Sequence, residues 1–177
     1  DNYDTVVPYI EKTKKNGVIA CVNFMKSYTK EPYLFERAAR EIASVGADYI
    51  YIVDSAGNMT PPTVRKYCER VQDLNIGFHA HNNLGMGVAN SLTAFQSGAK
   101  IIDGSILGFG AGCGNAQLEV IVAVFEKMGI STGIDLYGIL DCAHLAEKLF
   151  IKEIPSIKPS GVVSGLTGVF SGFVKHV

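Results

Sequence analysis

The stretch that decides the fold is Gly77-Phe78-His79-Ala80-His81-Asn82-Asn83-Leu84-Gly85, which closes a short apolar run beginning at Asn75. In an extended strand, side chains two residues apart point to the same side and lie roughly 6.5 Å apart along the strand. His79 and His81 therefore point toward one region of space. Imidazole is a common ligand of first-row transition metals, so this pair is a candidate metal site. The alternative is that two polar residues merely close a strand.

Apolar runs typical of buried strands alternate with amphipathic helical patterns on both sides of this stretch. The chain opens with the end of a helix, and each of four strands is then followed by a helix. The strands are expected at 18–24, 49–53, 75–81 and 100–105, and the helices at 32–45, from 61, 86–96 and 116–128. Because parallel neighbouring strands need a crossover connection, this alternation predicts an α/β fold with a parallel sheet.

Two architectures fit such a sheet, an open doubly wound sheet and part of a (β/α)8 barrel. The open sheet would carry a glycine-rich turn after its first strand, and Phe24-Met25-Lys26-Ser27 is not one. Polar residues instead gather where the strands end, at Asn23, Asp54-Ser55, His79, His81, Asp103 and Ser105. Barrels of this kind carry their chemistry at that end, and a full barrel takes about 250 residues. We therefore expect a partial (β/α)8 TIM barrel, half of the full structure.

The pattern changes after Met128. A helix is expected at 135–150, followed by a proline-bearing link at 154–160 and an apolar segment with spaced glycines at 162–177. Glycine is a poor helix former, so this spacing indicates close backbone packing, the alternative being a mobile tail. We expect two parts, the half barrel over 1–130 and a helical C-terminal extension over 131–177.

Composition excludes several classes of protein. Hydrophobic residues make up 47% of the 177 residues, the formal net charge is −1, and there is no basic cluster. Neither nucleic acid nor a membrane is therefore an expected partner, and no apolar run approaches the roughly 20 residues of a membrane span. Four scattered cysteines and an acidic start without a signal peptide suggest reduced thiols in the cytoplasm. Since the chain does not begin with Met, we expect it to be a piece of a longer protein.

Two motifs carry a family resemblance. His79-Ala80-His81-Asn82-Asn83-Leu84-Gly85 and Gly110-Ala111-Gly112-Cys113-Gly114-Asn115-Ala116 together resemble the metal-dependent aldolase/Claisen barrel superfamily, which includes HMG-CoA lyase and isopropylmalate synthase. The resemblance is greatest to its 4-hydroxy-2-oxovalerate aldolase branch and covers nearly the whole chain. It implies that the chain holds the fifth to eighth barrel strands. The first strand, which in the family supplies an Asp ligand, an Arg and a nearby His, is absent.

The resemblance also assigns roles to individual residues. It implies that His79 and His81 bind the metal, expected to be Mn²⁺ with Mg²⁺ or Zn²⁺ as alternatives. Ser55 matches a serine that binds the carboxylate of a 2-oxo acid, and Asn115 matches a polar position that binds metal or substrate. As alternatives, Ser55 and Asn115 could be helix caps. Asp54 is expected to be structural, holding a loop or a hydrogen bond behind the site. The C-terminal segment resembles the part of the aldolases that adjoins an acylating aldehyde dehydrogenase.

One position departs from the family pattern. A catalytic Tyr of the aldolases aligns with Phe170, whose side chain cannot donate a proton or a hydrogen bond. No catalytic residue is therefore assigned within this chain.

Three functions follow as hypotheses. The leading one is a carbon–carbon lyase that cleaves a 4-hydroxy-2-oxo acid to pyruvate and an aldehyde, of which this piece alone would be inactive. The second is an acetyl-CoA-dependent Claisen condensing enzyme. The third is a non-catalytic half-barrel module, and its open sheet edges predict an oligomer.

Overall fold

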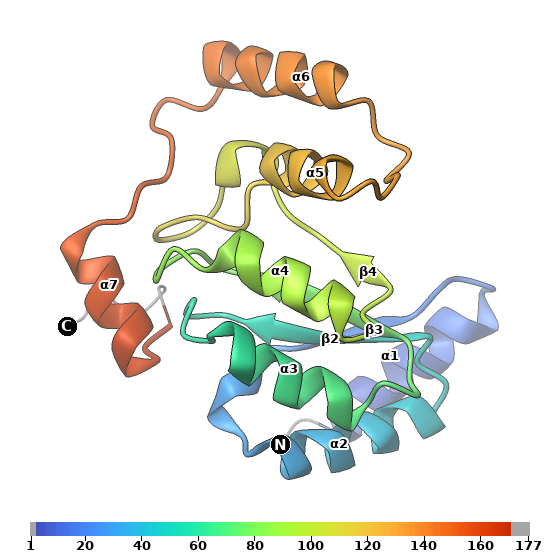
Figure 1. The fold of residues 1–177 in the computed structure, drawn as a ribbon. Coiled ribbons are helices and arrows are strands. Elements are labelled where there is room, and N and C mark those ends of the chain that lie inside the picture. The colour runs from blue at the N-terminus through green and yellow to red at the C-terminus, as the bar shows by residue number, and fades with distance from the viewer. Residues whose placement is uncertain (1–2, 171–177) are drawn as a thin grey trace.

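The computed structural model describes residues 3–170 and forms one parallel sheet covered by helices (Figure 1). The strands are β1 (Cys21–Phe24), β2 (Tyr49–Asp54), β3 (Ile76–Ala80) and β4 (Ile101–Ile102), paired in the order β1-β2-β3-β4. All the strands are parallel, and they lie in the sheet in the same order as in the chain. That order is the one found in a (β/α)8 barrel and differs from the reversed order of a doubly wound sheet. The chain is a partial barrel, as predicted.

Each crossover contains a helix close to its predicted position. The helices are α1 (Tyr3–Lys15), α2 (Pro32–Ser44), α3 (Pro61–Arg70), α4 (Gly87–Gln96), α5 (Leu118–Lys127), α6 (Leu136–Leu149) and α7 (Pro159–Thr167), with short 3-10 turns η1 (Ser27–Thr29) and η2 (Ile106–Gly108). Proline at the first turn starts α2, α3 and α7, where its missing N–H costs nothing. The left-handed Gly46, Gly98 and Gly129 follow the ends of α2, α4 and α5.

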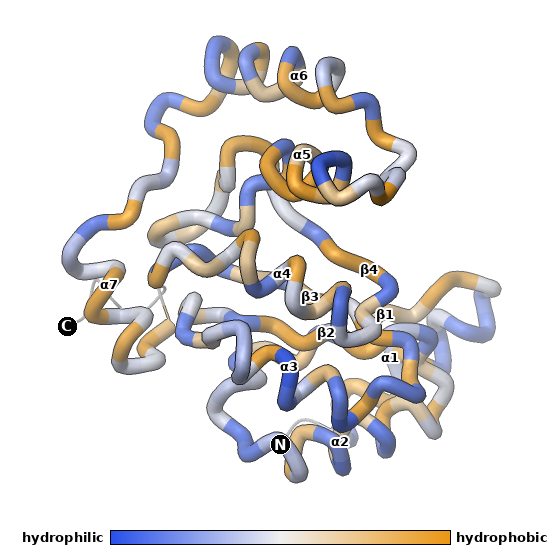
Figure 2. The backbone as a smooth tube through the Cα atoms, viewed as in Figure 1, coloured by the Kyte–Doolittle hydropathy of each residue, from blue (hydrophilic) through white to orange (hydrophobic). Residues whose placement is uncertain are grey.

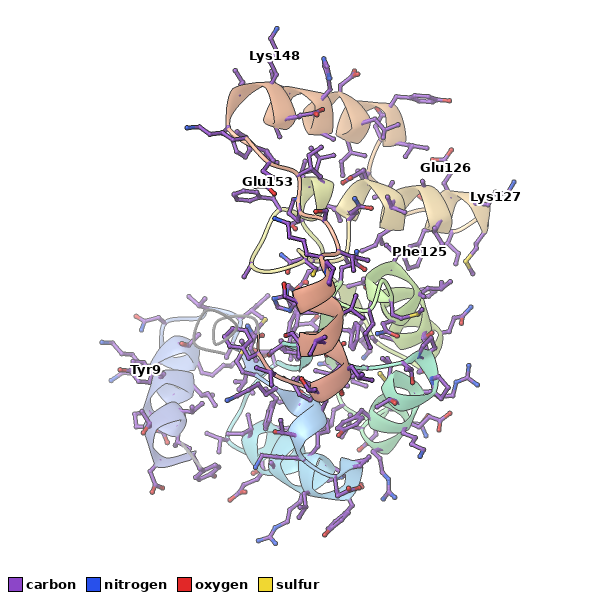
Figure 3. All side chains as sticks on the ribbon, turned by 90° about the vertical axis from the view of Figure 1, so that its left-hand side faces the viewer. Tyr9, Phe125, Glu126, Lys127, Lys148 and Glu153 are labelled. Atoms are coloured by element: carbon purple, nitrogen blue, oxygen red, sulfur yellow. The ribbon has the colours of Figure 1, made fainter. Side chains whose placement is uncertain are left out.

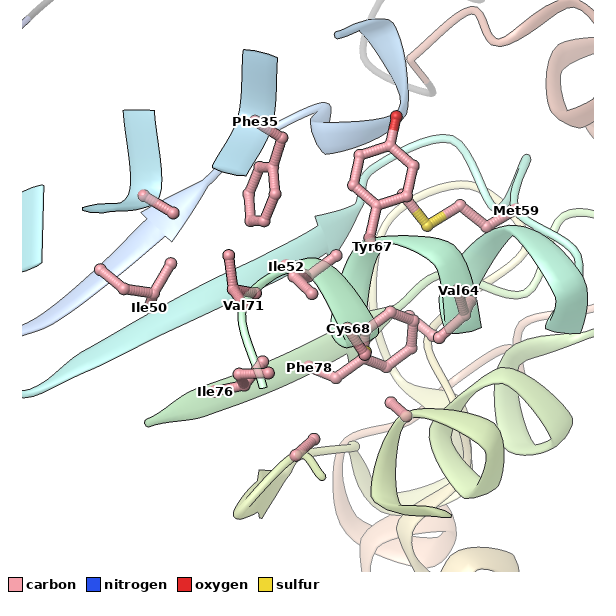
Figure 4. Packing of buried hydrophobic residues seen from close by; sticks show 14 of the residues in the cluster. Phe35, Ile50, Ile52, Met59, Val64, Tyr67, Cys68, Val71, Ile76 and Phe78 are labelled. Atoms are coloured by element: carbon pink, nitrogen blue, oxygen red, sulfur yellow. The ribbon is translucent and has the colours of Figure 1, made fainter. Parts of the chain in front are cut away.

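The core lies between the sheet and the helices. Alternate residues of β2 and β3 face the helices and are fully buried, and they pack on side chains from α1 to α5 (Figure 4). The cluster includes Ile52, Phe78, Phe35, Tyr67 and Val64. Figure 2 shows the apolar residues concentrated along β2 to β4. The opposite residues of β2 and β3, among them Tyr51, Val53, Gly77 and His79, face the barrel interior because side chains alternate along a strand.

The first strand differs from the prediction. It begins at Cys21 rather than Val18, and Val18 and Ile19 are 55% and 65% exposed. Residues of β1 alternate between exposed and half-buried, because β1 is an edge strand whose interior side no described residue covers. The apolar run at 18–24 is therefore not a strand buried on both faces.

The C-terminal segment forms two separate helices. Helix α6 packs on α5 through Ile139, Ala143 and Ala146, while Lys148 points away from the rest of the molecule (Figure 3). The link at 150–158 leads to α7, which lies near the carboxyl ends of β2 and β3 (Figure 1). The expected segment at 162–177 is thus a packed helix up to Thr167, and residues 171–177 lie outside the described residues.

The described residues contain neither a membrane-spanning helix nor a disulfide. None of the helices between residues 3 and 170 has the length and apolar character needed to cross a membrane. All four cysteines lie in this range and none forms a disulfide within it.

Candidate metal centre at the carboxyl end of the sheet

His79 and His81 lie side by side where β3 ends. Their ring centroids are 5.1 Å apart, with the ring planes inclined by 78°. The His81 side chain is buried, whereas that of His79 is 26% exposed. The two-residue spacing in an extended strand places both rings at the barrel interior, which is the arrangement expected from the sequence.

Both rings are held through the same ring nitrogen. The Nδ1 atom of His79 is 2.5 Å from Oδ1 of Asp103, and Nδ1 of His81 is 3.1 Å from the backbone carbonyl of Asp54. A carboxylate and a carbonyl only accept hydrogen bonds, so each neutral ring donates from Nδ1 and keeps the lone pair of Nε2. Within residues 3–170 neither Nε2 takes part in a hydrogen bond. Two nitrogen ligands are therefore available.

The surroundings of His81 favour its neutral form. Burial lowers the pKa of His81, and the neighbouring His79 lowers it further when that ring is protonated. Only the neutral imidazole has a lone pair with which to bind a metal. The environment of His81 is thus suited to a ligand.

Asn115 lies next to His81 in the fold. Its backbone pairs with that of His81 in an isolated antiparallel bridge, and Asn82 N–H donates to Gly114 O at 2.8 Å. The Asn115 amide donates from Nδ2 to Ser105 Oγ and Phe109 O, both at 3.2 Å. Its Oδ1 is buried and has no hydrogen-bond partner. A buried carbonyl oxygen without a partner is costly unless another group binds it, so this atom fits a metal ligand.

The described residues do not complete a metal site by themselves. Between residues 3 and 170, no three His, Cys, Asp or Glu side chains come together as a metal-binding group. Two imidazole nitrogens and one amide oxygen fit part of the coordination shell of a divalent metal, which for Mg²⁺ is octahedral.

Asp54 is the last residue of β2, Ser55 follows it, and both are fully buried. The Asp54 carboxylate accepts hydrogen bonds from Asn58 N–H at 2.9 Å and Met59 N–H at 3.0 Å, which is the structural role expected for it. Burial nevertheless raises the Asp54 pKa to about 6, against the lowering effect of these N–H groups. Ser55 Oγ accepts from Lys26 N–H at 2.8 Å, in a turn where Lys26 is left-handed. The hydroxyl of Ser55 can still donate, and its role as a substrate contact stays a prediction.

Helix α7 is tied to this end of the sheet by three side chains. The backbone carbonyls of Gly161 and Gly165 in α7 accept from Asn83 Nδ2 at 3.3 Å and Asn58 Nδ2 at 2.6 Å. The carbonyl of Gly168, just after the helix, accepts from Tyr28 OH at 3.0 Å. The glycines allow a close approach, because a Cβ at Gly161 would lie 2.0 Å from Cys113 Sγ.

The close backbone packing expected from the glycine spacing is therefore present at α7. Phe170 lies shortly after the end of α7 and is half-buried.

Comparison with known proteins agrees with this geometry. The model of the HMGL-like family matches residues 1–146. The chain belongs to the HMGL-like family. It is similar to 4-hydroxy-2-oxovalerate aldolases from Pectobacterium atrosepticum, at 51% identity, and Spirochaeta aurantia, at 49%. These alignments cover 96% and 88% of this chain but 50% and 46% of the relatives, so the chain spans about half the length of the curated relatives it matches.

Solved structures show the same relationship between this HMGL-like chain and longer proteins. A crystallised domain from Bacteroides vulgatus superposes with a TM-score of 0.86 at 26% identity, covering 99% of this chain and 59% of the other. An HMG-CoA lyase from Bacillus subtilis superposes with a TM-score of 0.72 at 28% identity, covering 82% and 54%.

Several residues around the HMGL-like centre carried no signal in the sequence. The hydroxyl of Tyr28 and the amide of Asn58 reach α7, more than 100 positions later in the chain. Asp103 was recognisable only as a polar residue at the end of a strand. Its contact with His79 depends on the register between β3 and β4. The pattern of apolar and polar residues does not reveal that register.

Proposed function

We propose that this chain is part of a metal-dependent carbon–carbon lyase that cleaves a 4-hydroxy-2-oxo acid to pyruvate and an aldehyde. The observation that carries the proposal is the pair of imidazoles whose Nδ1 atoms are held by acceptors while both Nε2 atoms remain available. Relatives named 4-hydroxy-2-oxovalerate aldolase, up to 51% identical, support the same reaction.

The proposed metal ligands in this chain are Nε2 of His79, Nε2 of His81 and Oδ1 of Asn115. Mn²⁺ is the proposed metal, because it accepts both imidazole and oxygen ligands, with Mg²⁺ or Zn²⁺ as alternatives. When bound, such a metal supplies Lewis-acid stabilisation of the negative charge that develops on the oxo acid.

The chain's own residues would bind and orient the substrate. Ser55 is proposed to donate its hydroxyl hydrogen to the substrate carboxylate while Lys26 N–H holds its oxygen in place. Asn115 is a second proposed substrate contact, positioned by its two amide hydrogen bonds.

Proton transfer is not assigned to the described residues. Cleavage requires a base that takes the 4-hydroxyl proton, and Phe170, at the position of the family Tyr, can act neither as an acid nor as a base. We propose that the base belongs to the part of the longer protein that this chain does not include, so that residues 1–177 alone are inactive.

The C-terminal residues 131–177 are proposed to form a helical extension that contacts a partner, for which an acylating aldehyde dehydrogenase is the candidate. Exposed apolar side chains on α6 support a contact surface, since Tyr137, Leu145 and Leu149 are 76%, 53% and 67% exposed.

The test is pyruvate release from a 4-hydroxy-2-oxo acid by the full-length protein with added Mn²⁺. His79→Ala removes a proposed ligand and should abolish Mn²⁺ binding and, with it, pyruvate release. His144→Ala, which changes an exposed histidine of α6, is the matched control and should keep both. Thiol release from acetyl-CoA in place of pyruvate formation would overturn the lyase assignment in favour of a condensing enzyme.

A further inference from the structure

Asp103 lies opposite His79 on the neighbouring strand. Gly77 pairs with Ile101 and Phe78 with Ile102, so the same parallel register places His79 beside Asp103. Residues paired in register point to the same face of a sheet, and both side chains therefore face the barrel interior. Their 2.5 Å contact follows from strand pairing and does not need a flexible loop to bring the two groups together.

The Asp103 carboxylate contacts the His79 ring. Among residues 3–170 it makes no other side-chain hydrogen bond or ion pair. The chain immediately after it is also held firmly, since a Cβ at Gly104 would lie 2.7 Å from Ala116 O and Ser105 N–H donates to the same oxygen at 3.1 Å. The carboxylate is 41% exposed, has one partner among the described residues, and is followed by backbone packed against Ala116.

The His81 ring is also held through Nδ1, but its acceptor is a backbone carbonyl. Its Nδ1 faces the backbone carbonyl of Asp54, which a side-chain substitution does not remove. The two histidines therefore share an orientation but differ in what holds it. Only the acceptor of His79 can be deleted by mutation, which makes His81 an internal control.

We propose that Asp103 is a positioning residue of the metal centre: its carboxylate holds the His79 ring in the Nδ1–H tautomer and so presents the Nε2 lone pair to the metal. The inference rests on the proposed function, because it assigns His79 as a ligand. A neutral imidazole has two tautomers, and the other one carries a hydrogen on Nε2 and cannot bind a metal there. Mutating a residue that accepts a hydrogen bond from a metal-binding histidine typically weakens metal binding by about 10- to 100-fold.

The direct test is the tautomer of His79 in the metal-free full-length protein, read from the ¹⁵N shifts of its ring by NMR at pH 8.5. The signal is assigned by its loss in His79→Gln. We expect Nδ1–H for both His79 and His81 in the wild type. In Asp103→Ala, His79 should become a mixture of tautomers while His81 is unchanged. Asp141→Ala, which makes the same substitution at an exposed residue of α6, should alter neither ring.

Metal titration separates this inference from the proposed function. We expect the dissociation constant for Mn²⁺ to rise about 10- to 100-fold in Asp103→Ala and to stay at the wild-type value in Asp141→Ala. A wild-type His79 in the Nε2–H tautomer would overturn the inference, and so would unchanged Mn²⁺ affinity in Asp103→Ala when His79→Ala loses binding. A wild type that binds no Mn²⁺ would instead overturn the proposed metal centre.

Discussion

The ring of Tyr51 on β2 lies directly over Gly77 on β3. The two residues are paired in the sheet, and a Cβ built at Gly77 would lie 2.4 to 2.6 Å from three atoms of the Tyr51 ring. Tyr51 is only 9% exposed, so its ring fills the barrel interior at this level. Glycine at position 77 therefore makes room for the tyrosine two residues before His79.

Gly77→Ala should destabilise the protein by about 1–3 kcal/mol, the usual cost of inserting a methylene into a packed interior. The free energy of unfolding in urea measures the effect. Tyr51→Phe in the Gly77→Ala background keeps the ring and should give no relief, whereas Tyr51→Ala should reduce the cost of the alanine. Equal costs in both backgrounds would show that the ring does not cover Gly77.

Gly161→Ala should also destabilise the protein, although alanine normally favours a helix over glycine by about 1 kcal/mol. The added Cβ would meet Cys113 Sγ and push α7 away from its hydrogen bonds to Asn58 and Asn83. Limited proteolysis near residues 150–158, together with urea denaturation, measures the loss.

Cys113→Ala in the same chain should rescue Gly161→Ala, because it removes the clashing sulfur. Val163→Ala, at a 59% exposed position of α7, is the control and should change neither measurement appreciably. Failure of the rescue would argue that α7 is not held against Cys113.

Cys68 should resist thiol reagents in the folded protein at pH 8. Burial, with a smaller contribution from Glu69, raises its pKa to about 12. Only about one thiol in ten thousand would then be the reactive thiolate at pH 8. The exposed Cys142 should react quickly, and Cys142→Ser should remove one fast-reacting thiol in a colorimetric titration. A matching loss of a fast thiol in Cys68→Ser would contradict the buried position of Cys68.

The contact between Asp48 and Lys14 should make stability depend on acid pH. Lys14 Nζ donates to both carboxylate oxygens at 2.6 and 2.7 Å, and Ala20 N–H donates at 2.7 Å, so the Asp48 pKa is lowered from 3.8. A lowered pKa in the folded state contributes stability above pH 3.8 that is lost as the pH falls through the folded value. Asp48→Asn should therefore unfold at lower urea than the wild type at pH 7, and the difference should shrink by pH 3. A difference that does not change with pH would exclude this linkage.

Much of the fold was predictable because its signals are local. The apolar run beginning at Asn75 predicts a strand, and the two-residue spacing places His79 and His81 on one side of it without reference to any other residue. Proline at helix starts and glycine at helix ends are equally local, and the helices between β1 and β4 lie near their expected positions.

The errors and omissions have a common physical cause. Residues 18–24 have the composition of a buried strand, yet burial depends on which strands lie on either side, and β1 has one neighbour among the described residues. Likewise, the family resemblance matches Ser55 to a substrate-binding serine but says nothing of its neighbours in this chain. Only the structure shows that its oxygen accepts a hydrogen bond from Lys26.

The sequence by itself determined the parallel α/β class, the strand carrying both histidines and the glycine pattern of α7, because these follow from backbone geometry within a few residues. Tertiary structure decided that Asp103 meets His79 and that Asn58, Asn83 and Tyr28 hold α7 at the end of the sheet. Those contacts join residues 24 to 140 positions apart, and they depend on strand register and on the packing of whole elements.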